Sequence, residues 1–284
     1  MITNVLSVDV EEYYHGMEFA AAVPGGRRES LPSRVERSVD QVLALLATAD
    51  THATFFIVGL VAEDHPEMVR KIDRAGHEIA CHSYRHELVY RQTPEEFRAD
   101  IRHAKAVLED LIGKEVRGYR APNYSIQTGQ SWAYDILLDE GFSYDSSIYP
   151  IVHDRYGQAD APRFFHEIRR RVDRSLIEFP IGTVHIAGVN LPLGGGGYFR
   201  LFPEWLFRLG IRRVNAQDRQ PVMFYFHPWE LDPDQPRPPM PWHHRFRHYV
   251  GLSRQGQKLS NLFRHIRFGT VRDVLAQTTE KGSV

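Results

Sequence analysis

Residues 76–86 read GHEIACHSYRH, and this stretch indicates an α/β fold with a reactive site at a strand end. Residues 78–80 suit a short buried strand, and His82 and His86 follow it directly. Imidazoles four residues apart share one face of a helix, and a tight loop can bring them together equally well. Neutral imidazole is the commonest protein ligand of divalent transition metals. The pair is a candidate metal site; in a chain of fifteen histidines, a chance or structural pairing is the alternative.

Short apolar segments alternate with amphipathic ones along the chain, which predicts an α/β fold with a parallel sheet. Strands are expected at residues 5–8, 53–58, 78–80, 118–120, 175–179 and 222–226. Helices are expected over residues 35–47, 64–75, 94–111, 131–140 and 205–216, with Thr93 as the N-cap of the third. A Pro- and Asp-rich break at residues 233–241 precedes an aromatic and basic tail, which could cap the main domain.

The composition is that of an ordinary globular protein, with 284 residues and a net charge of −1. This charge gives no reason to expect a nucleic-acid partner, and no apolar run approaches the roughly 20 residues of a membrane span. The single cysteine, Cys81, excludes an internal disulfide and fits a reducing compartment. No secretory signal is visible, so a cytoplasmic location is expected. The basic runs at residues 163–174 and 245–272 are interpreted as solvated faces, with contact to an anionic lipid carrier or polysaccharide as the alternative. The oligomeric state is unreadable from the sequence.

Reactive side chains also follow other predicted strands. Asp9 and Glu11 come after the first strand and share a side if the strand continues, so one could complete a metal site and the other act as general base. Arg120 precedes a rigid Ala-Pro turn and could orient a carboxylate. His227 follows three aromatic residues and emerges at a strand end. Surface acids and a satisfied core histidine are the structural alternatives, and Glu178 is as easily structural as functional.

In this order and spacing, these segments resemble the polysaccharide deacetylase family, also called the NodB-homology or carbohydrate esterase family 4 group. The resemblance covers residues 5 to about 230 and rests on Asp9, ATFF at 53–56, GHEI at 76–79, His82 to His86, RAP at 120–122 and His227. More narrowly, DVE at 9–11, LGGGGYFR at 193–200 and FHPWELDP at 226–233 resemble one bacterial subgroup. That subgroup is associated with exopolysaccharide loci of the PEP-CTERM and exosortase type.

The resemblance implies a distorted (β/α)7 barrel over residues 1–232, with residues 233–284 as a C-terminal extension packed on it. It also implies removal of N-acetyl groups from sugar residues of a polysaccharide or its precursor, in exopolysaccharide biosynthesis for this subgroup. The cofactor that it implies is a divalent metal, usually zinc, although histidine and carboxylate ligands also suit cobalt or nickel.

Roles for individual residues follow from the same resemblance. The implied set is His82 and His86 as metal ligands with one acid, Asp9 as general base, Arg120 as its partner and His227 as general acid. The family commonly carries two adjacent aspartates at the first strand, whereas this chain has Asp9-Val10-Glu11. By analogy with branches that carry acid-x-acid, Glu11 is the expected ligand; swapped roles are the alternative, and Glu12 is a third candidate.

Several residues near the predicted strand ends are candidates for contact with the sugar. They are Tyr14, Asn123, Tyr124, Tyr198 and Trp229, with Tyr13 and Phe199 as further aromatic candidates and core packing as the alternative for each. The glycine run at residues 194–197 predicts a wide turn close to substrate. Two other functions stay open: a metal-dependent amidohydrolase acting on a non-sugar amide or ureide, and a catalytically inactive carbohydrate-binding homologue.

Overall fold

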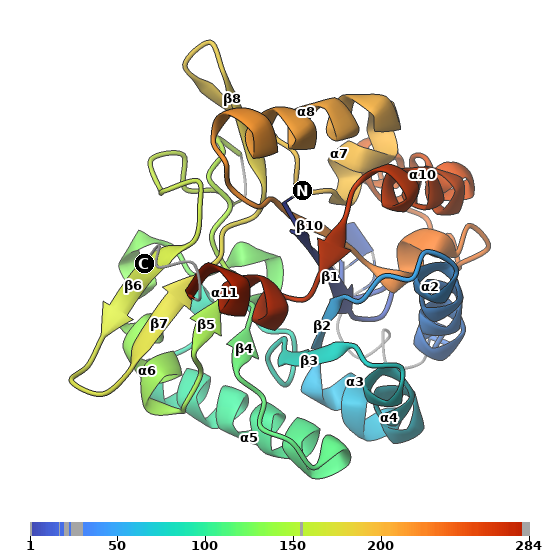
Figure 1. Cartoon of the computed structure of the whole chain (residues 1–284). Helices are drawn as coiled ribbons and strands as arrows, with labels where there is room; N and C mark the ends of the chain where they lie inside the picture. The colour runs from blue at the N-terminus through green and yellow to red at the C-terminus, as the bar shows by residue number, and fades with distance from the viewer. Residues whose placement is uncertain (1, 17, 20–22, 24–30, 154–155, 280–284) are drawn as a thin grey trace.

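The centre of the protein is one curled sheet (Figure 1). The computed structural model describes residues 2–16, 18, 19, 23, 31–153 and 156–279. Seven strands run parallel in the order β10-β1-β2-β3-β4-β5-β7. Their bounds are β1 (Asn4–Val10), β2 (Thr54–Ile57), β3 (Glu78–Cys81), β4 (Gly118–Tyr119), β5 (Tyr144–Asp145), β7 (Ser175–Glu178) and β10 (Met223–Phe226). The α/β fold with a parallel sheet is therefore confirmed, and each of the six expected strands is present.

Four further strands lie around the parallel sheet. β6 (His166–Arg170) pairs antiparallel with β7 at one edge. β8 (Thr183–Ile186) and β9 (Val189–Pro192) form a separate hairpin. β11 (Phe268–Gly269) pairs with the start of β1.

Helices lie around the sheet, most of them on its outer side (Figure 1). They are α2 (Val35–Thr48), α3 (Gly59–Asp64), α4 (Pro66–Arg74), α5 (Pro94–Ile112), α6 (Trp132–Asp139), α7 (Gly196–Leu201), α8 (Glu204–Gln217), α9 (Trp242–Tyr249), α10 (Leu252–His265) and α11 (Val271–Thr279). Thr93 caps α5 as expected, since its side chain accepts from the Glu96 N–H and the Glu96 carboxylate accepts from the Thr93 N–H. Within the described ranges, none of the helices combines the length and apolar character needed to cross a membrane.

A hydrophobic core lies on each face of the sheet, and the side chains of β1 alternate between the two cores. All seven positions of β1 are buried. Leu6 and Val8 belong to the core between the sheet and the outer helices, while Val5 belongs to the core inside the curl. Successive strand residues point to opposite faces, so Ser7 and Asp9 point inward like Val5.

The curl is closed by irregular chain between β7 and β10 rather than by a further ladder of strands. The Gly182 N–H donates to the Met223 carbonyl at 3.0 Å, and the Tyr225 N–H donates to the Gly194 carbonyl at 2.6 Å. Gly195 has a φ of 108°, and a Cβ there would lie 2.0 Å from the Tyr225 carbonyl oxygen, so only glycine fits. The expected distorted barrel is confirmed, and its ring of strands is incompletely closed. The glycine run at residues 194–197 forms the expected turn and also pairs with β10.

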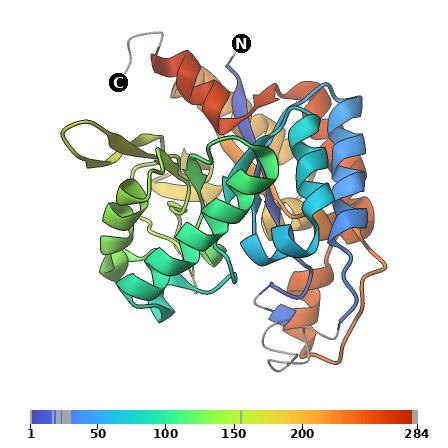
Figure 2. The same ribbon diagram turned by 90° about the horizontal axis from the view of Figure 1, so that it is seen from below.

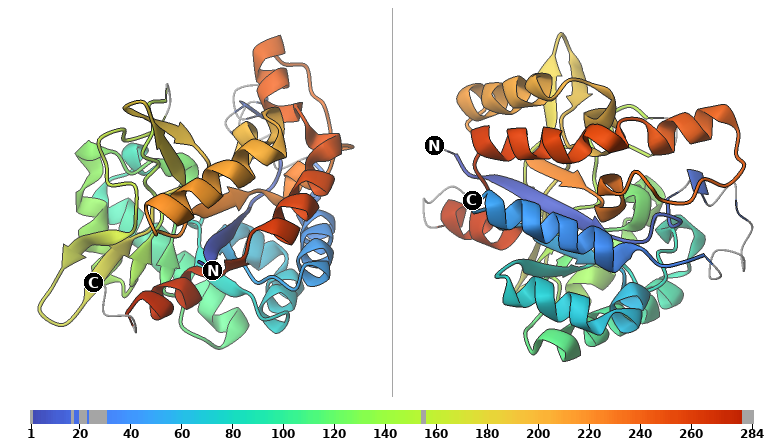
Figure 3. Two further views of the ribbon diagram at one scale, coloured as in Figure 1. Left: turned by 45° about the horizontal axis from the view of Figure 1, so that its top comes forward. Right: turned by 90° about the vertical axis from the view of Figure 1, so that its right-hand side faces the viewer.

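The amino ends of the strands are covered by α11, which lies across the barrel in Figure 1. The N–H of Val271 donates to Thr54 Oγ1 at 2.9 Å, and the N–H of Arg272 donates to Glu78 Oε2 at 3.1 Å. α9 lies at the other end, beyond the carboxyl end of β1 (Figure 2), and α8 and α10 run beside each other along one flank (Figure 3). The carboxyl ends of the strands are thus left to carry the site.

Candidate active site

Reactive side chains meet at the carboxyl ends of four strands. Asp9 is the penultimate residue of β1, while His82, Arg120 and His227 directly follow β3, β4 and β10. Because these strands run parallel, their carboxyl ends lie together. They surround a cavity of about 620 Å³ whose lining includes Asp9, Glu11, His82, His86, Asn123, Tyr124, Gly197, Tyr198, His227 and Trp229. Most residues predicted for the site therefore share one cavity.

Glu11, His82 and His86 form a group suited to a metal ion. Their potential donor atoms all lie within 4.8 Å of one another. Glu11 Oε2 and His86 Nε2 are 2.7 Å apart, and both side chains are almost fully buried. Two imidazoles and one carboxylate are a known ligand set of catalytic zinc sites, where three protein ligands leave a position open. The residues present fit a divalent metal.

His82 is held in the tautomer that a metal ligand needs. Its Nδ1 lies 2.8 Å from the carbonyl oxygen of Arg120. A carbonyl can only accept, so Nδ1 carries the proton and Nε2 keeps its lone pair. Burial lowers the pKa of His82 to about 4, which keeps the ring neutral at neutral pH.

The segment between the two histidines is a loop rather than a helix. Asp100, on α5, organises this loop because it accepts hydrogen bonds from Ser83 Oγ at 2.6 Å and from the N–H groups of Tyr84 and Arg85 at 2.7 and 3.2 Å. Ser83 and His86 have positive φ angles of 68° and 57°. Sequence reasoning left helix and loop open and did not identify Asp100, which lies fourteen residues beyond His86.

Glu11 is ionised and fixed from two sides. Burial alone would raise its pKa, but the neighbouring imidazoles of His86 and His227 hold the pKa of this carboxyl well below its usual range. Its Oε1 accepts a hydrogen bond from Trp229 Nε1 at 3.1 Å. Trp229 also stacks between His227 and His248, with ring centroids 5.1 and 4.7 Å away. The indole predicted to contact sugar therefore also orients an acid of the metal group.

Asp9 is held by Arg120 and lies outside the metal group. Arg120 has no exposed surface, and its Nη1 donates to Asp9 Oδ1 at 2.5 Å and to Ser7 Oγ at 3.0 Å. Its other nitrogens donate to the hydroxyl and carbonyl oxygens of Ser146, and the guanidinium lies 4.1 Å from the centre of the Phe56 ring. These contacts leave Arg120 one orientation, which aims the Asp9 carboxylate.

Glu12, the third candidate acid, has a different environment. Its Oε1 accepts hydrogen bonds from the N–H groups of Arg34 and Val35, at 3.2 and 3.4 Å, and from Ser33 Oγ. These donors lie at the start of α2, where backbone N–H groups have no partner within the helix. Burial raises the pKa of Glu12. Glu12 thus caps a helix and does not belong to the metal group.

His227 lines the same cavity as His82 and pairs with Glu230. Its Nδ1 donates to Glu230 Oε1 at 2.7 Å, and its Nε2 lies 3.7 Å from Glu11 Oε1. Burial alone would lower the pKa of His227, but Glu11 and Glu230 raise it above the ordinary value. The imidazole can therefore carry a proton near neutral pH, with Nε2 directed into the cavity.

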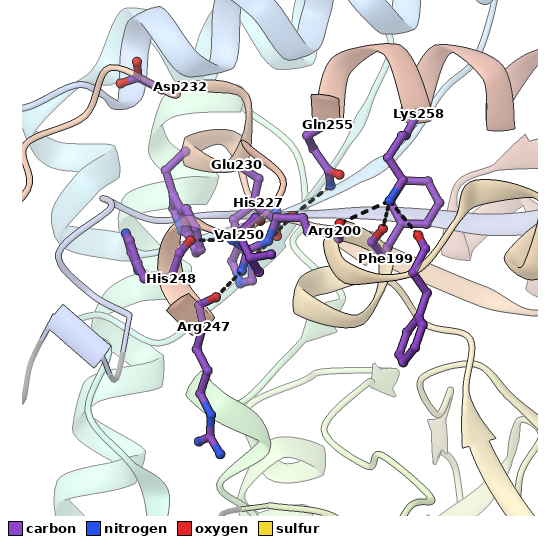
Figure 4. Close-up of polar contacts among 12 residues, drawn as sticks. Phe199, Arg200, His227, Glu230, Asp232, Arg247, His248, Val250, Gln255 and Lys258 are labelled. Carbon is purple, nitrogen blue, oxygen red and sulfur yellow. Dashed lines mark hydrogen bonds and ion pairs between the residues drawn. The ribbon is translucent and has the colours of Figure 1, made fainter. Parts of the chain in front are cut away.

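Residues from the C-terminal half hold Glu230 in turn (Figure 4). Glu230 has no exposed surface; its Oε2 accepts from Gln255 Nε2 at 2.8 Å and pairs with Arg200 Nε at 3.3 Å. Arg200 also donates to the carbonyls of Arg247 and His248, in the last turn of α9, and of Val250, directly after it. Arg200 and Glu230 lie inside the family-like segments 193–200 and 226–233, but the sequence alone assigns them no role. The spacing of His227 and Glu230, three residues apart on a 3-10 turn, was the available signal.

The predicted sugar contacts divide into two groups. Asn123, Tyr124, Tyr198 and Trp229 line the cavity. Tyr14 is half-buried outside this lining and packs edgewise on Tyr13. The further candidates Tyr13 and Phe199 are fully buried in the hydrophobic cores, so their rings serve packing.

Backbone strain gathers at the same place. In the described part of the chain, seven residues other than glycine have positive φ, and four of them belong to the site segments: Ser83, His86, Asn123 and Tyr124. Left-handed backbone is costly for an aromatic residue such as Tyr124, whose φ is 54°. Such strain concentrates at functional sites, where the surrounding structure maintains it.

Comparison with known proteins divides the chain in two. A polysaccharide deacetylase model matches residues 30–134, and a model described as a domain of unknown function (DUF3473) matches residues 146–276. His82, His86 and Arg120 lie in the first match, and His227 lies in the second. The cavity is therefore built from both matched segments, together with β1.

Relatives agree with the first match. A peptidoglycan deacetylase from Helicobacter pylori is 28% identical over 157 residues, which cover 51% of this chain and 53% of the relative. The chain thus spans about half the length of this relative and a smaller share of the next ones.

Solved structures share the fold. A Mycobacterium smegmatis protein classed with polysaccharide deacetylases superposes with a TM-score of 0.64 at 17% identity, covering 99% of this chain and 91% of its own. The allantoinase Puue superposes with a TM-score of 0.65 at 17% identity, covering 100% and 92%. The solved structures agree with the fold expected for the matched model. The chain therefore contains a polysaccharide deacetylase domain of the NodB, or carbohydrate esterase family 4, type.

Proposed function

We propose that this protein is a metal-dependent hydrolase that removes N-acetyl groups from sugar residues of a polysaccharide or its precursor. The observation that carries the proposal is the group of Glu11, His82 and His86, whose donor atoms lie within 4.8 Å in a cavity that also holds Asp9 and His227. Hydrolysis of an amide needs an activated water, stabilisation of the oxyanion and a proton for the departing amine. The cavity contains one group for each need.

Glu11, His82 and His86 would hold the metal. When bound there, a divalent metal supplies a Lewis acid that polarises the acetyl carbonyl and lowers the pKa of water to about 7. Two imidazoles and a carboxylate suit zinc, with cobalt or nickel as alternatives. The neutral ring of His82 and the ionised Glu11 have the protonation states that such ligands require.

Asp9 would accept the proton of the attacking water. Its place beside the metal group, and the fixed guanidinium of Arg120 behind it, support this role. The swapped assignment, with Asp9 as ligand and Glu11 as base, is less well supported, because Glu11 already faces His86 at 2.7 Å while Asp9 is engaged by Arg120.

His227 would donate a proton to the departing nitrogen as the C–N bond breaks, releasing acetate and leaving a free amine on the sugar. Its raised pKa favours the protonated ring that this step needs. Glu230 would keep Nδ1 protonated and the ring in position. Asn123, Tyr124, Tyr198 and Trp229 would contact the sugar, since they line the cavity. Tyr14 could reach only a longer substrate.

The biological setting is proposed from the resemblance alone. The segments at residues 9–11, 193–200 and 226–233 support a role in exopolysaccharide biosynthesis. We also propose residues 1–232 as the catalytic barrel and residues 233–284 as its extension, because α9 borders the cavity and α11 covers the opposite end of the barrel. The cytoplasmic location and the absence of a nucleic-acid partner stay predictions.

A second candidate function is hydrolysis of a non-sugar amide or ureide. The similarity of the fold to an allantoinase favours keeping it, since the same architecture serves a ureide in that protein. An inactive carbohydrate-binding protein is less well supported, because a binding role gives no reason to keep Asp9, Arg120 and His227 around the metal group.

The test is metal analysis combined with two hydrolysis assays. The protein is stripped with a chelator, reloaded with zinc, and assayed for acetate release from N-acetylglucosamine oligomers and for turnover of allantoin. Bound zinc with metal-dependent acetate release supports the proposal. Bound zinc with turnover of allantoin alone supports the second candidate. A purified protein that takes up no zinc, cobalt or nickel would overturn both.

A further inference from the structure

Exposed hydrophobic side chains are concentrated in one part of the molecule. Among the described residues, fourteen large hydrophobic side chains are exposed, and ten of them lie between residues 186 and 246. They belong to three neighbouring elements: the β8–β9 hairpin, the α7–α8 segment, and α9. We call this surface the apolar rim. Gathered exposure of this kind on a soluble fold marks an interaction surface.

α8 carries the centre of the apolar rim. Trp205 and Leu209 are four residues apart on one face, and they are 53% and 60% exposed. The opposite side of the helix, with Phe207, Ile211 and Val214, is buried against the core. The helix therefore has an apolar face toward the protein and a second apolar face toward solvent. Packing within this chain explains the inner face but not the outer one.

The apolar rim continues from the hairpin to the mouth of the cavity. α8 packs on β8, and the hairpin and α8 lie on the same side of the molecule in Figures 1 and 3. At the other end, Leu201 of α7 and Trp242 and Phe246 of α9 are exposed and also line the active-site cavity. Whatever covers the apolar rim therefore lies next to the entrance of the cavity.

The helices of this region are strongly basic. α8, α9 and α10 together contain eight arginine or lysine residues and a single acid, Glu204, although the whole chain has a net charge of −1. Arg212, Arg213, Arg245 and Arg254 are exposed, and none of them forms an ion pair with another described residue. The basic charge flanks the exposed hydrophobic side chains, and an anionic partner would complement it.

We propose that the apolar rim docks on the surface of a membrane rich in anionic phospholipid. Tryptophan, leucine and phenylalanine beside arginine are the composition of helices that lie in a membrane interface. The apolar side chains would enter the boundary of the acyl chains, and the arginines would pair with anionic headgroups. A hydrated anionic polysaccharide would complement the arginines but would offer nothing apolar to Leu206 and Leu209. The proposal does not depend on the hydrolytic activity.

Vesicle binding tests the proposal. The whole protein is sedimented with vesicles of equal parts phosphatidylglycerol and phosphatidylcholine, and separately with phosphatidylcholine alone, at 0.1 M salt. We expect binding to the anionic vesicles, weakened by higher salt, together with a blue shift of tryptophan fluorescence. The variants Trp205→Asp/Leu209→Asp and Arg212→Glu/Arg213→Glu should each lower the affinity at least tenfold.

Val172→Asp is the matched control, since Val172 is fully exposed at the turn between β6 and β7, away from the apolar rim. It should bind as the wild type does. Circular dichroism and acetate release from soluble oligomers should be unchanged in Trp205→Asp/Leu209→Asp, because these side chains do not line the cavity. Failure of the wild type to bind anionic vesicles overturns the proposal, as does binding that these substitutions leave intact. A dimer that Leu209→Asp converts to monomer, without vesicle binding, would assign the surface to a second copy.

Discussion

The two walls of the active-site cavity are held by different means. On the metal side, His82 is fixed by the carbonyl of Arg120, and its loop by Asp100 at the centre of α5. On the side of β10, His227 is fixed by a series of buried side chains that runs from Glu230 to Arg200 and Gln255. The first wall relies on backbone and one nearby helix, whereas the second relies on polar side chains from three separate parts of the chain.

Under the proposed mechanism, this difference gives the C-terminal half a role in the chemistry. The deacetylase model ends at residue 134, before the segment that supplies His227, Glu230, Arg200 and Gln255. The domain of unknown function therefore contains the proposed proton donor and the three side chains that hold it. Variants on the two walls should behave differently: changes on the first should remove the metal, and changes on the second should leave it bound.

His82→Ala should have the largest effect. It deletes one of three ligands, so the protein should lose its metal, and acetate release should fall to background. Metal content by mass spectrometry and acetate release on the same sample measure both. His185→Ala, an exposed histidine on β8, is the control and should keep both. Full metal occupancy in His82→Ala would contradict the ligand assignment.

His227→Ala should retain the metal and lose most turnover. Removing a general acid typically costs roughly 10²–10⁴-fold in rate. The expected loss lies in kcat, with metal content equal to that of the wild type, which separates this wall of the cavity from the first. An amide analogue with a better leaving group should restore part of the rate, because it needs less protonation. Unchanged turnover would remove His227 from the mechanism.

The contrast also explains what the sequence could predict. Asp9, His82 and His227 each follow an apolar run, whereas Arg120 follows the short Gly118–Tyr119 strand and precedes the family-like Ala-Pro turn. Strand recognition and the family resemblance together located these four residues. β5 and the β8–β9 hairpin were missed because neither has a continuous apolar pattern or a family-like motif beside it.

The supporting residues were not predictable for a physical reason. Arg200 and Gln255 lie 30 and 25 residues from Glu230 along the chain, and their contact depends on how α7 and α10 pack. The aromatic ring of Trp229 led us to expect a contact with sugar. Its hydrogen bond from Nε1 to Glu11 depends on the pairing of β10 with β1, which the local sequence does not show. Buried charge pairs leave no pattern in the local sequence, because a charged residue taken singly is expected at the surface.

Glu230→Gln should have an intermediate effect and tests the second wall directly. The amide leaves His227 without its anionic partner, and we expect kcat to fall roughly 10–100-fold with KM and metal content unchanged. It also leaves Arg200 as a buried unpaired cation, which should lower the free energy of unfolding by about 3 kcal/mol. Activity is measured well below the melting temperature, and stability by urea denaturation.

A double-mutant cycle sharpens that result. Arg200→Met combined with Glu230→Gln should be less destabilised than the sum of the two single changes, because the second removes a charge that the first left unpaired. Glu67→Gln, at an exposed pair with Arg70, is the matched control and should change stability by less than about 1 kcal/mol. Strict additivity would mean that Arg200 does not act through Glu230.

Glu178→Gln should have the smallest effect on activity. It tests whether this buried acid stabilises the fold, in contrast to Glu230, which holds a residue of the active site. Asp145 on β5 and Glu178 on β7 are register partners, and neither has exposed surface. Burial raises the pKa of Asp145 to about 6, and burial together with Asp145 raises that of Glu178 well above its usual value. The pair therefore keeps at least one proton near neutral pH.

The direction of the pH effect follows from these raised values. The folded protein binds a proton that the unfolded chain releases above about pH 4.5, so stability should fall as the pH rises from there through the folded pKa values. A single such proton gives a slope of at most about 1.4 kcal/mol per pH unit. Glutamine keeps the shape of Glu178 and can donate to Asp145 without titrating, so its stability should fall less steeply between pH 5 and 8. Melting temperatures across this range measure the slope, with the partly exposed Glu167→Gln as control. Acetate release should stay within twofold of the wild type. An equal slope in Glu178→Gln and the wild type would show that this pair does not hold the proton. A loss of acetate release in Glu178→Gln would show that the pair also supports the active site.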